Sequence, residues 1–445
     1  MRSFFKNITS LSVLFLSLFC IVSCSKDEYK AASDNTGGNE KVLMVLRISP
    51  INASDALAEV TEKIQTLRII IIGQEYDAQN QPTKKYAVEC NRLIDLGTSV
   101  TASQYSSHFT WPTKPGAKKI YLIANEASVK NISYQKPTSG NLPKDLPTNL
   151  SDLLNSYGSK EDSDDSGSGT ALNSDGDEFE QIINSVYFEP TYTPNDKNEV
   201  FLPYVSFYDG VEAVKEQTTN VEMFLVPVAT KFVYEFYNNR DNPVEVRTID
   251  VTQTDSHNFL TAHIGKSEQT KQFEGNDLYW IDWLAKVAEE SQKHQDFDGN
   301  VNFNEKYGWI SNYSIPTASG KTTAHMIGDM SPLPRVPGKQ RGADGADVSG
   351  RLTVGPFYYP ESRNFYNADK KENESNQIYC LTLDLFDVKT ETSPVFENIP
   401  ISNLQALFRN TCVIIRVTMG QGNVDVYAEM MPWNVNKVFG SVVEQ

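Results

Sequence analysis

Short β-type segments separated by turn-forming residues are the feature that most limits what this chain can fold into. Runs such as 64–73 (IQTLRIIIIG), 231–237 (KFVYEFY) and 411–419 (TCVIIRVTM) are rich in β-branched and aromatic residues. The intervals between such runs are filled with Pro, Asp, Asn and Gly. Segments of this length and composition favour strands over helices. The pattern predicts a mainly β protein, and 445 residues argue for two tandem antiparallel β-sandwich domains with a few short helices.

The segments suggest an order along the chain. We place the first domain at 41–226 and the second at 227–445. A short helix is expected at 150–154, and a longer one at 277–291 with Asn276 or Asp277 as its cap. Residues 156–177 are acidic and polar and read as a solvated surface loop. Strands are expected at 41–48, 64–73, 120–124, 186–188, 201–207, 221–226, 231–237, 244–251, 411–419, 423–431 and 433–443.

The first 23 residues have the pattern of an export signal. Arg2 and Lys6 precede a run at 11–22 that is mostly apolar and too short to span a bilayer as a helix. Cys24 follows a small residue at the end of this run, which resembles the lipobox of bacterial lipoproteins. The resemblance implies a lipid on Cys24 after cleavage; the alternative is an ordinary signal peptide with Cys24 as a spare thiol. Residues 24–40 read as a flexible tether.

Charge and cysteine content exclude some classes of partner. The net charge of −17 becomes −19 without Arg2 and Lys6, and no basic block is present to neutralise phosphates, so nucleic acid is not an expected partner. Besides Cys20 and Cys24, the chain has Cys90, Cys380 and Cys412, which show no zinc-site spacing. A bridge between Cys380 and Cys412 is possible, but buried apolar packing is the favoured interpretation.

No complete catalytic or ligand motif is found in the sequence. The chain contains neither HExxH nor GxSxG, and Gly320-Lys321-Thr322 lacks the upstream glycine of a phosphate-binding loop. Oxygen-bearing side chains alternate at 296–302, as in a calcium loop, but the turn glycine and the final Glu are missing, so a polar loop is favoured. We therefore expect no enzyme activity, no catalytic or metal site and no cofactor.

Several segments, taken in order, resemble the Bacteroidales fimbrillin family, the subunits of type V pili. In the first domain they are an alternating strand after the tether (41–48), a hydrophobic strand (64–73) and a strand ending in Ala-Asn (120–125). The second domain opens with a strand at 226–236 and has a further matching segment at 356–362. Near the end come an Arg-Asn before an alternating strand (409–419) and a strand running into a tryptophan (424–433).

The resemblance implies a transthyretin-like β-sandwich fold and a function in a cell-surface fimbrium that supports adhesion. The lipidated precursor would be anchored at the outer membrane, where a protease removes the first strand. The candidate site is Arg47, with Ile48 as the new terminus; the alternative is that Arg47 is a solvent-facing residue of that strand. The groove would then be filled by the tail of another subunit, a donor-strand exchange. Without cleavage the chain would act as a base anchor, and the sequence leaves shaft, tip and anchor roles open. In this chain the donor residues of the tail would be Val435, Val438, Phe439, Val442 and Val443.

The alternative function is a surface lipoprotein that binds carbohydrate in a glycan-uptake system. Such a protein should expose Trp and Tyr side chains in a concave site. Here aromatic residues such as Phe232, Tyr234 and Phe236 alternate as core residues do. The sequence therefore favours the fimbrial subunit, with other fimbrial subunits as its partners.

Overall fold

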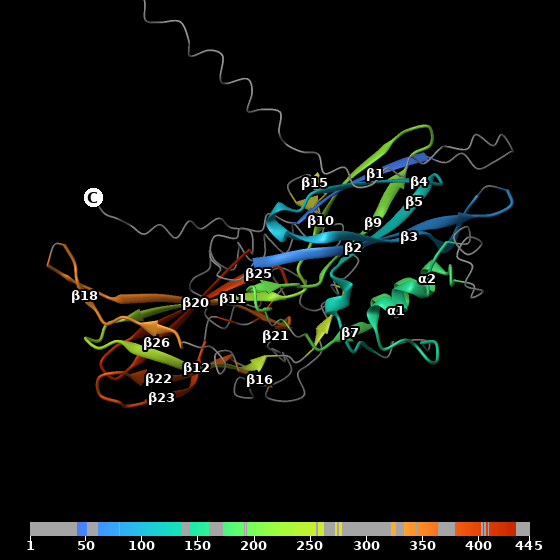
Figure 1. Ribbon diagram of the computed structural model, residues 1–445. Helices are drawn as coiled ribbons and strands as arrows, with labels where there is room; N and C mark the ends of the chain where they lie inside the picture. Colours follow the sequence, from blue (N-terminus) through green and yellow to red (C-terminus); the bar gives the residue numbers. More distant parts are fainter. Residues whose placement is uncertain are drawn as a thin grey trace, which may run out of the picture. The chain divides into compact units, whose positions relative to one another are not determined.

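A computed structural model gives the arrangement of the strands (Figure 1). It describes residues 42–50, 61–79, 81–135, 142–159, 172–190, 192, 194–254, 257–261, 272–273, 276–277, 322–325, 333–343, 345–363, 379–401, 404, 406–407 and 409–432.

Two sheets enclose the first hydrophobic core, here called the N-terminal sandwich. One sheet has the order β10-β1-β4 and the other the order β3-β2-β5-β9, with β8 attached to β2. Buried side chains from both sheets form one cluster. The strands are β1 (Val42–Pro50), β2 (Thr61–Tyr76), β3 (Pro82–Thr101), β4 (Ser107–Thr113), β5 (Gly116–Ala124), β8 (Glu199–Val200), β9 (Tyr204–Ala213) and β10 (Thr219–Leu225).

The run of four isoleucines in the sequence lies in strand β2, both faces of which are buried. Ile69 and Ile71 lie in the core between the two sheets. Ile70 and Ile72 belong to a second core, on the other face of the sheet, together with residues of two helices. These helices, α1 (Leu150–Asn155) and α2 (Gly176–Ile183), lie along the sheet (Figure 1). A strand covered on both faces reads as a continuous apolar run instead of an alternating one.

Helix α1 confirms the short helix expected at 150–154, whereas α2 was not predicted. The end of the expected loop at 156–177 is wrong, because α2 begins at Gly176. The Asp175 side chain caps this helix by accepting hydrogen bonds from the backbone N–H groups of Asp177 and Glu178. An N-cap acid followed by apolar residues three and four positions apart is the signal that could have revealed the helix.

A second pair of sheets, the C-terminal sandwich, encloses another core. Their orders are β20-β11-β25-β26 and β16-β12-β22-β23, with β17 attached to β12. The strands are β11 (Thr230–Asn238), β12 (Val244–Thr254), β16 (Thr322–His325), β17 (Arg335–Val336), β20 (Gly350–Tyr359), β22 (Cys380–Asp387), β23 (Val395–Pro400), β25 (Thr411–Met419) and β26 (Val424–Pro432).

The remaining described elements are short. The pair β14 and β15 contradicts the start of the helix expected at 277–291, because Asn276 and Asp277 lie in β15, which pairs with β14. The rest of that expected helix lies outside the described residues. The short elements are β6 (Ser133–Tyr134), β7 (Val186–Phe188), β13 (Asn258–Phe259), β14 (Gln272–Phe273), β15 (Asn276–Asp277), β18 (Gln340–Arg341), β19 (Asp347–Val348), β21 (Ser362–Arg363), β24 (Ala406–Leu407), and the 3-10 turns η1 (Ala102–Gln104) and η2 (Glu126–Ser128).

The predicted fold class is confirmed: the protein is mainly β, with sandwiched sheets and few helices. The pairing is mostly antiparallel, but β1 with β10, β2 with β8, and β11 with β25 are parallel. The division of the chain into domains at residue 226 stays a prediction. Within the described ranges, no helix has the length and apolar character needed to cross a membrane.

A buried ion pair links the two sandwiches. Glu62 of β2 accepts a hydrogen bond of 2.8 Å from Lys231 Nζ of β11 and one of 3.0 Å from the Tyr358 hydroxyl of β20. Tyr358 itself belongs to the core of the N-terminal sandwich. Buried charges persist only when they are paired and hydrogen-bonded. The first residues of β2 therefore depend on side chains from the C-terminal sandwich.

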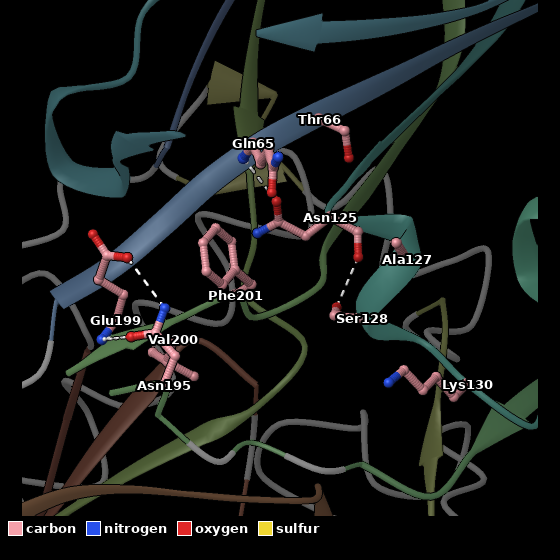
Figure 2. Close-up of a pocket in the computed structure, with 10 residues that line it drawn as sticks. All are labelled: Gln65, Thr66, Asn125, Ala127, Ser128, Lys130, Asn195, Glu199, Val200 and Phe201. Carbon is pink, nitrogen blue, oxygen red and sulfur yellow. Dashed lines mark hydrogen bonds between the residues drawn. The ribbon is translucent and has the colours of Figure 1, made fainter. Parts of the chain in front are cut away.

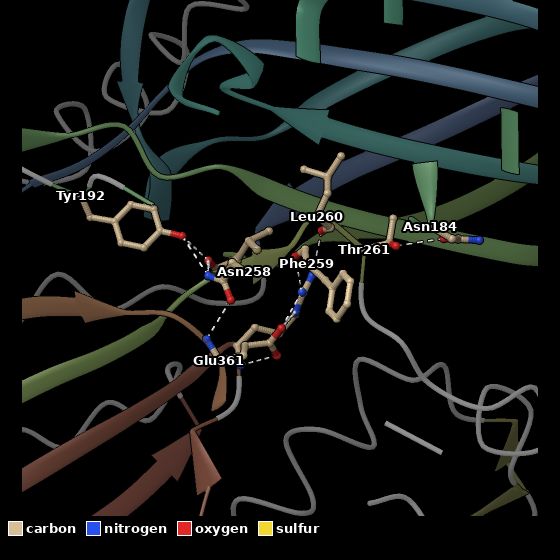
Figure 3. A network of polar contacts seen from close by, with 9 residues as sticks. Asn184, Tyr192, Asn258, Phe259, Leu260, Thr261 and Glu361 are labelled. Carbon is tan, nitrogen blue, oxygen red and sulfur yellow. Dashed lines mark hydrogen bonds and ion pairs between the residues drawn. The ribbon is translucent and has the colours of Figure 1, made fainter. Parts of the chain in front are cut away.

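A second buried network, the Arg409 network, lies around Asn258 and Glu361 (Figure 3). The Arg409 guanidinium donates to Glu361 Oε2 at 2.8 and 2.5 Å and to the carbonyls of Phe259 and Leu260 at 2.8 and 3.0 Å. Leu260 packs in the core beside α1 and α2, and β13 pairs with β7. Asn258 donates to the Val228 carbonyl and accepts from the Glu361 N–H. A segment that follows β12 is thereby held against the helix side of the N-terminal sandwich.

Replacing Arg409 should destabilise the whole protein. Arg409→Met leaves the Glu361 carboxylate buried without its charge partner, a change that costs about 3–5 kcal/mol in comparable sites. Chemical denaturation measures the free energy of unfolding. The matched control is Lys339→Met, because the Lys339 ammonium pairs with exposed carboxylates of Asp241 and Asp347 and exposed pairs contribute about 0–1 kcal/mol. Equal effects of the two substitutions would contradict this assignment.

Candidate functional site: strand β1 and its groove

Strand β1 is the middle strand of its sheet. It runs parallel to β10, with Met44 opposite Thr219, and antiparallel to β4, with Met44 opposite Trp111. The first described strand after the expected tether is thus paired on both sides (Figure 1). Without β1, the facing edges of β4 and β10 would present unpaired backbone N–H and C=O groups, which are costly when buried.

The side chains of β1 alternate strictly between core and surface. Four of them, at every second position, are at most 4% exposed: Val42, Met44, Leu46 and Ile48. Full burial of such a side chain contributes about 1.5–3 kcal/mol to the free energy of unfolding. The four together therefore contribute about 6–12 kcal/mol at most. On the opposite face, Leu43 is 43% exposed and Arg47 is also exposed. Strand β1 is therefore held by the packing of one side-chain face against the core and by backbone pairing along both of its edges.

The space between β4 and β10 that β1 fills is an apolar groove, named here the β1 groove. Met223 and Leu225 of β10 are fully buried in the same core, and Phe109 and Trp111 of β4 pack against it. The two aromatic rings are stacked with centroids 6.0 Å apart, and the Arg92 guanidinium of β3 lies 5.4 Å from the Trp111 ring centroid. A strand in the β1 groove therefore meets large apolar side chains from both neighbouring strands.

Arg47, the predicted processing residue, lies inside β1 and not in a loop. Its neighbours across the sheet are Glu222 on β10 and His108 on β4, and Ile48 is paired on both sides as well. A protease binds its substrate as an extended segment that is free of other strands. Cleavage after Arg47 therefore requires β1 to open, and it would leave residues 48–50 next to β10.

The other predicted site residues lie outside the described residues. These are Cys24, where lipid is expected, and the tail residues Val435, Val438, Phe439, Val442 and Val443. The possible calcium loop at 296–302 is outside them too. Strand β26, which precedes the tail, pairs antiparallel with β25 and ends at Pro432. Processing, lipidation and tail donation remain predictions.

None of the three remaining cysteines is in a disulfide, so Cys380 and Cys412 are not bridged. Cys412 and Cys90 are buried, in agreement with the favoured interpretation of apolar packing. Burial, foremost, raises the pKa of the Cys412 thiol to about 12. This thiol is therefore neutral and unreactive at ordinary pH.

Two short motifs behind the family resemblance have structural functions. Asn125, in the Ala-Asn that ends β5, has a positive φ of 55°, which Asn tolerates better than most residues. Its side chain accepts from the Gln65 N–H at 2.9 Å and donates to the carbonyls of Lys63 and Leu202. Arg409, in the Arg-Asn before β25, is the centre of the Arg409 network. Both motifs fasten strand ends together.

A pocket of about 290 Å³ beside Asn125 is the site at which a small ligand would be sought (Figure 2). Its lining includes Phe201, Gln65 and Lys130. Much of its polar lining is already used internally, since Asn125 holds three backbone groups and Ser128 Oγ donates to the Asn125 carbonyl. The hydrogen-bonding groups of Asn125 and Ser128 therefore serve the fold of the protein itself.

The aromatic residues do not form a platform for sugars in the described ranges. Phe232, Tyr234 and Phe236 are fully buried, as predicted. The exposed large aromatic residues are Tyr76 on β2 and Tyr427 on β26, which belong to different sheets. The same ranges contain no cluster of three His, Cys, Asp or Glu residues that could hold a metal ion.

Comparisons with known proteins return fimbrial and adhesion proteins of Bacteroidales. No protein-family model matches the chain, and no curated protein matches it. Among solved structures, it is similar to the tip fimbrial protein Mfa3 of Porphyromonas gingivalis with a C-terminal truncation, at 10% identity and a TM-score of 0.43, covering 88% of this chain and 100% of that one. A putative cell adhesion protein and a fimbrial assembly protein, both of Parabacteroides distasonis, match at 10% identity with TM-scores of 0.40 and 0.35, each covering 88% of this chain and 96% of the other.

The inward face of β1 should contribute far more to stability than the outward face. Leu46→Ala removes a fully buried side chain and should lower the free energy of unfolding by about 2–5 kcal/mol. Leu43→Ala, in the same strand, should change it by no more than about 0.5 kcal/mol, because Leu43 faces solvent. Urea denaturation of both variants tests the placement of β1, which equal effects would refute.

Proposed function

We propose that this chain is a structural subunit of a cell-surface fimbrium, a type V pilus, which is exported as a lipoprotein precursor and polymerised by donor-strand exchange. The observation that carries the proposal is the position of β1. A strand close behind an expected lipid tether fills the middle of a sheet, with four side chains in the core. Its partners would be other fimbrial subunits, and the fimbrium would support adhesion.

The physical basis of assembly is the replacement of one strand by another. Loss of β1 would expose an apolar groove together with the unpaired edges of β4 and β10. Such edges are templates for an extended segment from another chain, which gains main-chain hydrogen bonds and buries alternate side chains. An incoming strand from a second subunit would restore both contributions. Subunits joined in this way form a chain of strand additions.

Removal of β1 would follow cleavage after Arg47 at the bacterial surface. Arg47 is the single basic residue between Lys41 and Lys63, so a protease that cuts after basic residues has no other site from the first residue of β1 to the start of β2. Because the Arg47–Ile48 bond lies in a paired strand, β1 would open before it is cut. A precursor whose β1 stays closed would keep its outer-membrane lipid and act as a base anchor.

Lipidation of Cys24 can be tested in cells. Cys24→Ala should abolish incorporation of radioactive palmitate and leave the precursor unprocessed or released from the membrane. Globomycin, which blocks the lipoprotein signal peptidase, should cause accumulation of the unprocessed form. Substitution of Cys20, which lies within the predicted signal peptide, is the matched control and should leave labelling intact. Palmitate labelling that persists in Cys24→Ala would refute the lipid site.

The tail can be tested by truncation. Deleting residues 438–445 should leave a folded monomer, because the deletion begins after β26 ends, but this monomer should not assemble. The measurement is the ladder of polymers on a gel of surface material, with the unfolding curve of the purified chain as control for folding. Ladders that persist after truncation would contradict donation by the tail. N-terminal sequencing of the same material tests processing: Ile48 indicates a cleaved subunit and a blocked Cys24 indicates an anchor.

A further inference from the structure

The β1 groove sets a requirement for any strand that replaces β1. Val42, Met44, Leu46 and Ile48 fill it at four successive alternate positions, and the two central ones, Met44 and Leu46, are fully buried. Even if cleavage after Arg47 left Ile48 in place, three successive positions would need large apolar side chains. The requirement is the same for either direction of the incoming strand, because alternation reads the same both ways.

The tail of this chain does not meet the requirement. In extended form, one of its faces would carry Val438, Gly440 and Val442, and the other would carry Phe439, Ser441 and Val443. Each face thus has a glycine or a serine between two apolar residues. Shifting the register toward Trp433 does not help, because Asn436 and Lys437 are then included. No window of 434–445 has large apolar residues at three successive alternate positions.

From this mismatch, and resting on the proposed strand exchange, we infer that the partner entering the β1 groove is a different chain. Its donor segment carries large apolar side chains at three or four successive alternate positions, as β1 does. A small residue at the Met44 position would leave a cavity there, because the Met44 side chain is fully buried in the core. The chain therefore joins other subunits in a heteropolymer and does not polymerise with itself.

The experiment uses the whole chain with β1 still in its groove. A specific protease sequence is inserted between residues 51 and 60 of the Cys24→Ala protein, and after cutting β1 is held only by non-covalent contacts. Labelled peptides are then offered in excess, and exchange is followed by fluorescence anisotropy. The peptides are residues 42–50, residues 434–445, and residues 434–445 with Gly440→Leu. Two variants of the first peptide, Met44→Ser and Leu43→Ser, form a matched pair for the inward and outward faces.

We expect the 42–50 peptide to enter the groove and the 434–445 peptide to bind at least about 30-fold more weakly, as loss of a large core side chain implies. Gly440→Leu should recover most of this difference. Met44→Ser should weaken the 42–50 peptide to a similar extent, and Leu43→Ser should change it little. The cut protein should also remain monomeric by itself.

Two results would overturn the inference in distinguishable ways. If the 434–445 peptide binds as tightly as 42–50, or if the cut protein forms polymers without another chain, the groove accepts its own tail; strand exchange then stands and the heterologous partner does not. If no peptide enters, including 42–50 itself, strand exchange fails and the inference fails with it.

Discussion

The architecture depends on one constraint: a buried strand edge must have a partner. Strand β1 satisfies it for β4 and β10 simultaneously, and its inward side chains complete the core between the two sheets. The backbone bonds fix where a strand must lie, while the alternating side chains fix which face it presents. Because these contributions come from one nine-residue segment, another segment of the same pattern could replace it without any change in the rest of the sandwich.

Contacts between the two sandwiches hold the sheet that lies across the core from the β1 groove. Strand β2 crosses the core opposite β1, and its residue Glu62 is held by Lys231 and Tyr358 from the C-terminal sandwich. The Arg409 network fastens the segment after β12 to the helix side of the same sheet. Buried, directional pairs of this kind tolerate little change in geometry. On the proposed function, a subunit built in this way would present a preorganised groove after loss of β1, which would lower the free-energy cost of accepting a strand.

On the proposed function, the acceptor and donor properties of this chain would be separate. The groove would require large side chains at alternate positions, since the inward side chains of β1 are buried in the core between both sheets. The tail, with Gly440 and Ser441 at its centre, has a different pattern and would suit a groove with a shallow middle. Specificity between subunits is a difference in free energy, and an unfilled cavity disfavours the wrong partner as effectively as contacts favour the right one. Such a separation would give a mixed fimbrium a defined order of subunits.

The sequence alone determined the elements whose pattern is local. Alternation or β-branching placed the strands around 42–50, 230–238, 411–419 and 424–432, because period-two burial leaves a direct trace in the residues. It also supplied the Ala-Asn and Arg-Asn motifs, but not their function, since Asn125 and Arg409 act through partners about 60 and 150 residues away. Helix α2 was missed although it has a cap, and Asp277, expected to begin a helix that Asn276 or Asp277 would cap, lies with Asn276 in a strand. Only the tertiary structure decided that β1 is central and that it runs parallel to β10, because strand order depends on contacts between segments distant in the chain.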